Sequence, residues 1–450
     1  MRRVIALIVR IFFRRIAVTG AEHVPATGPL LLVVNHPNSL VDPLLVLAYA
    51  PRRVAFLAKE PLFRTPVIRW LVRAAGSIPV YRRQDGADTT QNRRTFERVW
   101  DALSKGRAIA LFPEGMSHSD PHLRPFKTGM ARMALGAAAQ NPAAVVSIVP
   151  GGLYYTAKVR FRSSALLSFG EPIQVDVVPV DETGEPSAEP VRALTARLEA
   201  ALAAVTLHTE ADDALRLVTR AERVFSSVEG SGTRDRDLEQ QFALRQRFLR
   251  GYGELRRTEP REVERVERLL NRYDAELTAA GLAPESLLRS QLTPGMVIGG
   301  GAQAIATLLI LAPFAVAGMV IHFPGYLVTG PLATRAIHGQ RDVIATAKIL
   351  AAGAIYPISW LLAAWAVARM TSLPWGLAAL VGSPALGYAA LLFLEQLDRL
   401  TGSARGLSLR LFRPMTYRRF EAQRQRIREA ILQLNEKLDG PERRENGKER

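Results

Sequence analysis

The stretch "PLLLVVNHPNSLVDP", residues 29–43, decides how the N-terminal half of the chain folds. Its aliphatic run predicts a strand that ends near Val34. The polar loop that follows carries Asn, His and Asp. Pro43 suits the first position of a helix, and Asp42 then stands where an N-cap belongs. A strand that passes through a short polar loop into a helix is typical of an α/β sheet domain.

The alternation of strand and helix patterns continues to about residue 205. Further apolar runs, with helical patterns between them, lie at 77–81, 108–112, 145–150 and 166–170. These runs predict one α/β domain whose sheet is flanked by helices.

Composition narrows the class of protein. The 450 residues are 48% hydrophobic, and 59 Lys and Arg against 42 Asp and Glu give a net charge of +17. Such a surplus predicts an anionic partner: nucleic acid, a membrane surface, or phosphorylated and thioester-carrier substrates. The chain has no cysteine, which excludes disulfides, thiolate nucleophiles and cysteine-based metal sites.

Three long stretches without charge predict a membrane protein. They cover 297–321, 349–368 and 370–394, and each has enough residues to span a hydrocarbon core. Arg369 and a few polar residues are all that join the last two stretches, so we predict a tight hairpin there.

The positive charges around these stretches bear on topology. They are dense before the first stretch, in the loop with Arg335, Arg341 and Lys348, and after Arg399. If all three regions are cytoplasmic, the first stretch must enter the membrane and return, with a break at glycines 299–301 or at Pro313. Three complete crossings are the alternative.

The remaining segments are helical in pattern. The basic, amphipathic start of the chain predicts a helix in the membrane interface, or alternatively a helix packed on the protein's own core. We divide the chain into that helix at 1–18, the α/β domain at 19–206, a charged helical region at 207–290, membrane-embedded helices at 291–398, and a basic helical tail with a disordered end at 399–450.

The opening loop also offers a catalytic pair. His36 and Asp42 have plain interpretations as a turn residue and a helix cap. A carboxylate at this distance along the chain can also hold an imidazole in one tautomer, so that the free ring nitrogen takes a proton from a substrate hydroxyl.

Three other strand ends carry polar residues that suit an anionic ligand. "GSIPVYRR" leads to Arg82, "LFPEGMSHSD" contains Glu114 and Gly115, and "PFKTG" contains Lys127. Arginine can bind phosphate oxygens in a bidentate way. Because polar residues follow several strands in order, we predict one polar face above the sheet.

Together these motifs resemble the glycerolipid acyltransferase superfamily. The matching residues, which fall between about 15 and 205, are His36 and Asp42; Gly76, Ile78 and Arg82; Phe112, Pro113, Glu114 and Gly115; and Val149 with Pro150. Five residues separate His36 from Asp42 where the family usually has four. This variant looks similar to fungal-type glycerol-3-phosphate and dihydroxyacetone-phosphate acyltransferases, which also carry membrane segments after the catalytic domain.

The resemblance implies an α/β acyltransferase domain with a mixed sheet, acting on the cytoplasmic face of a membrane in phospholipid biosynthesis. A fatty acyl group would pass from acyl-CoA or acyl-carrier protein to glycerol 3-phosphate or lysophosphatidic acid, with no other cofactor and no metal. His36 would be the general base and Asp42 its support. Arg82, Glu114 and Gly115 would bind the acceptor, with Lys127 as a further candidate.

Two rival functions have some support in the residues. "HSDPH" places His118, Asp120 and His122 at alternate positions, as a metal-dependent hydrolase would allow. The basic charge alone would suit a nucleic-acid-binding membrane protein, but the basic tail has few aromatic residues among its charges and contains no recognised binding module. We therefore expect membrane lipids as partners and no nucleic acid.

Overall fold

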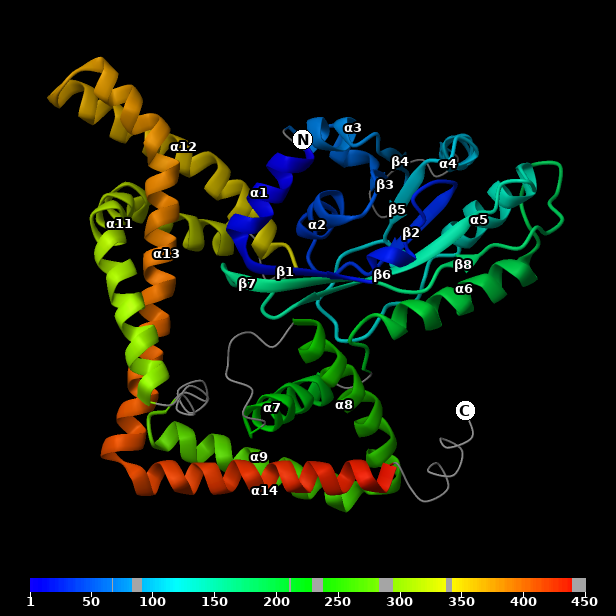
Figure 1. Cartoon of the computed structure of the whole chain (residues 1–450). Coiled ribbons are helices and arrows are strands. Elements are labelled where there is room, and N and C mark those ends of the chain that lie inside the picture. Colours follow the sequence, from blue (N-terminus) through cyan, green and yellow to red (C-terminus); the bar gives the residue numbers. More distant parts are fainter. Residues whose placement is uncertain are drawn as a thin grey trace. The chain divides into compact units, whose positions relative to one another are not determined.

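Figure 1 shows the computed structural model of the chain, which describes residues 1–66, 68–82, 91–209, 212–228, 238–282, 294–336 and 342–438. The chain divides into two units. The catalytic unit, so called because it contains the predicted catalytic pair of His36 and Asp42, comprises Met1–Asp212 and also Gly339–Thr346. The helical unit contains Asp213–His338 and Ala347–Arg450. The inclusion of residues 339–346 in the first unit was not predicted.

The catalytic unit is built on an eight-stranded sheet with the order β1-β7-β6-β2-β5-β3-β4, and β8 pairs with β6. The strands are β1 (Phe13–Thr19), β2 (Leu30–Val34), β3 (Val54–Lys59), β4 (Ile78–Val80), β5 (Ala108–Leu111), β6 (Ser147–Tyr155), β7 (Ser163–Phe169) and β8 (Ile173–Gln174). All pairs are parallel except those of β6 with β7 and with β8. The predicted mixed sheet flanked by helices is confirmed.

Helices cover both faces of this sheet (Figure 1). Leu31 and Val33 of β2 point into a core shared with α4 (Asn92–Ser104), α5 (Gly129–Gln140) and α6 (Ala188–Ala204). Alternate residues of a strand face opposite sides, so the other β2 side chains meet the layer formed by α1 (Arg2–Phe12) and α2 (Val41–Tyr49). Every β2 residue is at most 1% exposed, which explains why the whole strand is aliphatic. The short helices η1 (Ala21–His23), η2 (Glu60–Phe63) and α3 (Ile68–Ala74) lie in the connections.

The start of the chain corrects one prediction. We predicted a helix over 1–18, but α1 ends at Phe12 and the following residues form β1, which pairs in parallel with β7. The helix has two apolar faces. Ile5 and Val9 are buried, and Arg2 donates hydrogen bonds to backbone carbonyls at the end of α2, whereas Val4 and Leu7 are about 60% exposed. α1 therefore packs on the protein and keeps a second apolar face outside.

The start of α2 corrects another. The helix begins at Val41 after Leu40, so Asp42 is its second residue rather than its N-cap, and Pro43 is its third. The Val41 N–H donates to the Asn38 carbonyl and the Asp42 N–H donates to the Ser39 carbonyl. These bonds make the helix begin two residues before Pro43. Pro43 is still acceptable, because N–H groups of the first turn have no partner within the helix.

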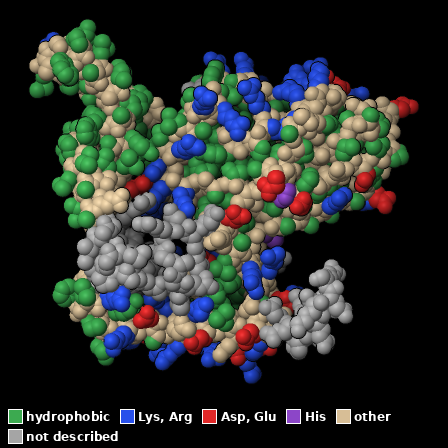
Figure 2. Space-filling view, viewed as in Figure 1, with side chains coloured by type: hydrophobic (Ala, Val, Ile, Leu, Met, Phe, Trp, Pro, Cys, Tyr) green, Lys and Arg blue, Asp and Glu red, His purple; other side chains and the backbone are tan. Residues whose placement is uncertain are grey.

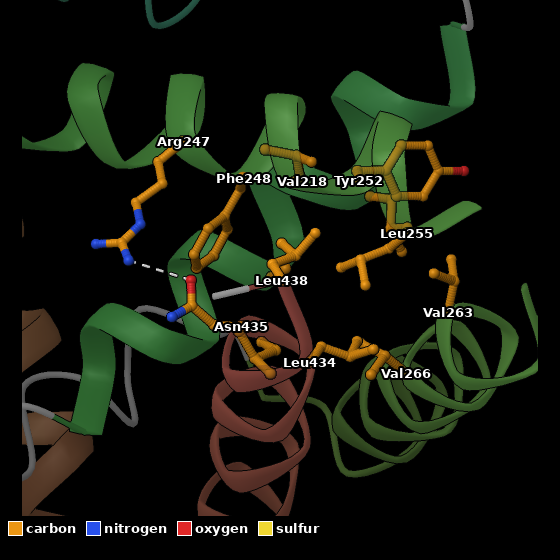
Figure 3. Close-up of a pocket in the computed structure, with 14 residues that line it drawn as sticks. Val218, Arg247, Phe248, Tyr252, Leu255, Val263, Val266, Leu434, Asn435 and Leu438 are labelled. Carbon is orange, nitrogen blue, oxygen red and sulfur yellow. Dashed lines mark hydrogen bonds between the residues drawn. The ribbon is translucent and has the colours of Figure 1, made fainter. Parts of the chain in front are cut away.

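Four helices of the helical unit, together with Leu409, form one apolar cluster. They are α7 (Asp212–Val228), α8 (Leu238–Thr258), α9 (Pro260–Ala279) and α14 (Pro414–Leu438). The residues that α9 buries there recur at three- and four-residue steps: Val263, Val266, Leu270, Tyr273 and Leu277. Figure 3 shows a largely apolar pocket among these helices, with Arg247 donating to Asn435 at one end over 3.2 Å. None of the predicted site residues lines this pocket.

The predicted apolar stretches coincide with three long helices: α11 (Pro294–Ala336), α12 (Ile344–Met370) and α13 (Leu373–Phe412). Each contains a stretch long and apolar enough to cross a membrane, as predicted. In Figure 2 the part of the molecule at upper left, where α12 and α13 meet, is covered mainly by hydrophobic side chains. α11 continues through glycines 299–301 and Pro313, so the predicted break at these positions is wrong. The predicted disorder at the chain's end falls on 439–450, outside the described residues.

One close approach in the catalytic unit leads to a stability prediction. A methyl group on Gly152 of β6 would lie 1.8 Å from the backbone oxygen of Val205. We expect Gly152→Ala to lower the free energy of unfolding by about 2 kcal/mol or more, at the upper end of overpacking effects, measured as a fall in the apparent Tm of detergent-solubilised protein. The matched control is Gly129→Ala at the start of α5, where an added methyl group would have no atom within 4 Å apart from its chain neighbours and its own helix backbone. Equal melting temperatures for the two variants would contradict the prediction.

Candidate active site

The carboxyl ends of parallel strands bring the predicted site residues to one edge of the sheet. β6, β2, β5, β3 and β4 are consecutive and parallel. His36 follows β2, Arg82 follows β4, Glu114 follows β5, and Tyr155 ends β6. Loops at this edge of a parallel sheet are the usual place for a ligand site, and the predicted polar face is present.

The His36 ring is held by its neighbours. Its Nδ1 lies 2.8 Å from Asp42 Oδ2. The rings of His36 and Phe112 are stacked with centroids 3.8 Å apart and planes 8° apart. Because an ionised carboxylate only accepts, Nδ1 carries the proton and Nε2 has the free lone pair. The His36 side chain is 16% exposed and that of Asp42 is fully buried, so the imidazole is the accessible member of the pair.

Asp42 receives two further hydrogen bonds. The Tyr155 hydroxyl donates to Oδ1 at 2.5 Å, and the Asn38 N–H donates to Oδ2 at 2.6 Å. Burial, and then the charge of Asp42, raise the pKa of Tyr155 well above its usual value, so this phenol stays a donor. The sequence analysis missed Tyr155, because nothing in "GGLYY" distinguishes it from other residues of a buried strand.

Glu114 supports the site from the opposite side. One carboxylate oxygen accepts the His36 N–H at 3.1 Å, and the other accepts the Arg124 N–H at 3.1 Å and the His118 imidazole. We predicted that Glu114 binds substrate. Its side chain is fully buried, and both oxygens are bonded within the protein, where they hold the His36 loop. Substrate binding by Glu114 stays a prediction.

Arg82, Gly115 and Lys127 meet at the turn after β5. Arg82 Nη1 donates to the carbonyl of Gly115, which has a positive φ of 75°. The Lys127 N–H donates to Pro113 O at 2.8 Å, and its exposed side chain runs beside Gly115. Two cationic side chains at one turn form a favourable setting for a phosphate group.

Comparisons with known proteins show which families and enzymes the chain is similar to. Residues 15–153 match the family model described as "Acyltransferase", and residues 231–443 match "Glycerol-3-phosphate acyltransferase 2 C-terminal domain". The first part of the chain thus matches an acyltransferase domain. The resemblance seen in the motifs is thereby confirmed, while the meaning of the five-residue spacing stays a prediction.

Individual relatives carry related names. Glycerol-3-phosphate O-acyltransferase 2 of Saccharomyces cerevisiae is 25% identical over 72% of this chain and 56% of its own length. 1-acyl-sn-glycerol-3-phosphate acyltransferase of Borreliella burgdorferi is 28% identical over 37% of this chain and 61% of its own. The crystal structure of the 1-acyl-sn-glycerophosphate (LPA) acyltransferase PlsC from Thermotoga maritima is 22% identical, covering 45% of this chain and 78% of that one, with a TM-score of 0.33. The chain thus spans less than two thirds of the length of these two curated relatives.

A second residue near the candidate site was also missed. Lys158 lies in the loop between β6 and β7, where the Asn38 side-chain amide donates to its carbonyl oxygen at 3.3 Å. Burial lowers the pKa of Lys158, while the nearby carboxylates of Asp42, Asp342, Asp120 and Glu114 act in the opposite direction. Lys158 therefore adds a partly buried cation to the surroundings of the catalytic pair.

The metal-site interpretation of "HSDPH" is not favoured. His118 is bound to Glu114, and Asp120 accepts a hydrogen bond from Arg124 at 2.7 Å, which lowers the pKa of that carboxyl. His122 is exposed. Among the described residues, no three His, Asp or Glu side chains are arranged as metal ligands.

Tyr155 gives a direct test of the candidate site. Tyr155→Phe removes one hydrogen bond to a buried carboxylate, a contact worth about 1.5–3 kcal/mol, so we expect kcat to fall by about 10- to 100-fold. The control is Tyr49→Phe, which removes a hydroxyl bonded to the exposed Arg10 of α1. Acyl transfer by both variants is measured in isolated membranes at matched protein levels. A Tyr155→Phe variant as active as the control would remove Tyr155 from the site.

Proposed function

We propose that the chain transfers a fatty acyl group from a thioester to a hydroxyl of a glycerol phosphate acceptor, as a step in phospholipid biosynthesis. The observation that carries the proposal is the His36–Asp42 pair, bonded at 2.8 Å, on the same sheet edge as the Arg82 and Lys127 turn. The names of the relatives and of the matched family models support the same reaction.

The geometry suits general-base catalysis. His36 Nε2 would take the proton from the acceptor hydroxyl while its oxygen attacks the thioester carbonyl carbon. The tetrahedral intermediate then collapses, the carbon–sulfur bond breaks, and the leaving thiolate takes the proton from the imidazolium. Asp42 stabilises that imidazolium and keeps Nε2 directed at the substrate. Such a base is typically worth about 10²–10⁴ in rate. The reaction needs no cofactor besides the acyl donor.

We assign glycerol 3-phosphate as the acceptor ahead of lysophosphatidic acid. The supporting observations are the five-residue spacing between His36 and Asp42 and the match of residues 231–443 to a glycerol-3-phosphate acyltransferase model. Relatives named as 1-acyl-sn-glycerol-3-phosphate acyltransferases match a shorter part of the chain. The phosphate of the acceptor would lie at the turn that bears Arg82 and Lys127.

The donor and the location follow from charge. Acyl-CoA and acyl-carrier protein are both anionic, and a chain with a net charge of +17 attracts either one. The positive residues around the apolar helices favour a catalytic unit on the cytoplasmic face. That face is where soluble thioester donors are found.

His36 is the first residue to test. Membranes containing the wild type or His36→Ala receive labelled acyl-CoA together with glycerol 3-phosphate or lysophosphatidic acid. We expect at least a 100-fold loss of product with His36→Ala, the lower end of a general base's contribution, and a preference of the wild type for glycerol 3-phosphate. The control variant His122→Ala keeps full activity, also in EDTA. Loss of activity in His122→Ala or on chelation would favour the metal-dependent rival.

Arg82 tests the binding of the acceptor. Arg82→Gln removes a cation from the proposed phosphate turn, so we expect the KM for glycerol 3-phosphate to rise by about 10-fold or more, given about 1.5–3 kcal/mol for a charged hydrogen bond. The KM for the acyl donor should change little. Arg73→Gln, an exposed arginine in the last turn of α3, serves as the control. The assignment is wrong if the two variants have the same acceptor KM.

A further inference from the structure

A segment far away in the sequence forms part of the active-site surroundings. Asp342–Thr346 precedes and begins α12, yet it belongs to the catalytic unit. The Leu40 N–H donates to Thr346 Oγ1 at 3.1 Å, and the Ser117 hydroxyl donates to Asp342 Oδ2 at 2.5 Å. Ala345 and Thr346 are 0% and 7% exposed. The segment is thus bonded to two loops of the site, the one between His36 and Asp42 and the one after Glu114.

The bond to Leu40 lies at a sensitive point of the catalytic loop. Leu40 is the N-cap of α2, and no side chain of the loop itself caps this helix. The first N–H groups of a helix need acceptors from outside it, and Thr346 supplies one. The preceding residue, Ser39, has a φ of +42°, which a residue with a side chain rarely adopts. A conformation of this kind persists only where its surroundings hold it.

Asp342 is linked to the same site by charge. Burial lowers the pKa of Lys158. The carboxylates of Asp42 and Asp342 both act in the opposite direction. One ammonium group therefore lies within electrostatic range of the catalytic carboxylate and of the segment between two candidate spans. This placement agrees with the hydrogen bonds of Thr346 and Asp342.

We propose that Thr346 is a positioning residue of the active site, and that Asp342–Thr346 holds the His36–Asp42 loop in its working conformation. Only the kinetic test of this proposal rests on the proposed acyl transfer. The cross-linking and labelling tests do not depend on it. Because α12 begins within this segment, the catalytic loop is held at the start of a candidate membrane span. This would keep the base close to the membrane surface, where acylated products accumulate.

Cross-linking tests the placement without any assay of activity. The chain has no cysteine, so Ser117→Cys with Asp342→Cys is the only thiol pair, and we expect efficient closure by mild oxidation in membranes. The control pair is Ser117→Cys with Thr371→Cys. Thr371 follows the far end of the 27-residue α12, about 40 Å away along the helix. Failure of the first pair to close, or equal closure of both, overturns the proposal.

Labelling tests the side of the membrane. A single cysteine at Asp342 should react with an impermeant maleimide from the same side of sealed vesicles as a single cysteine at the exposed Asp181 of the catalytic unit. One complete crossing by α11 would place Asp342 on the opposite side. Reaction from opposite sides therefore overturns the proposal.

Kinetics test the positioning role. We expect Thr346→Val to lower kcat about 10-fold, with both KM values within about twofold of the wild type, and Thr346→Ser to restore most of the rate. Thr371→Val, which removes a hydroxyl bonded only to the helix backbone at Val367, should have no effect. No loss in Thr346→Val, or a loss that serine does not restore, overturns the role. If the wild type itself transfers no acyl group, the proposed function fails while the cross-link result stands.

Discussion

The structure of the site depends on one buried carboxylate. Asp42 is fully buried, and a buried charge is costly unless hydrogen bonds satisfy it. Its partners come from three places: the His36 ring after β2, the Asn38 N–H in the loop, and the Tyr155 hydroxyl at the end of β6. These groups meet only if β2 and β6 are neighbours in parallel register, which is what the sheet order provides. The catalytic pair and the fold therefore support each other.

A second buried carboxylate fixes the remaining side of His36. Glu114 accepts the His36 N–H, and Phe112, two residues before it, stacks on the ring. The backbone, the Nδ1 atom and one face of the imidazole are thus each held by a separate contact. Since a site works best when its reactive group is fixed by surrounding residues, the free Nε2 is well placed to act on a bound hydroxyl.

The sequence predicted the parts of the site that depend on local pattern. A buried aliphatic strand and polar residues at successive strand ends suffice to place His36, Arg82 and Glu114 at one edge of a parallel sheet. The predicted start of α2 was wrong because backbone hydrogen bonds in the loop outweighed the preference of proline for the first helical position. Tyr155 and Thr346 were missed because they bond to residues 113 and 306 positions away, and no periodicity reports such contacts.

The packing of α14 limits how the apolar helices can cross a membrane. α14 shares an apolar cluster with α9, and Arg419 and Lys437 of α14 form ion pairs with Glu276 and Glu259 at 2.7 and 3.1 Å. Both helices are too charged to lie within a bilayer. Because they are also in contact with each other, they lie on the same side of it. The chain between them must then cross an even number of times. At most two of the three candidate spans, α11, α12 and α13, are therefore complete crossings. Any such pair of crossings would return the basic α14 to the side on which α9 lies.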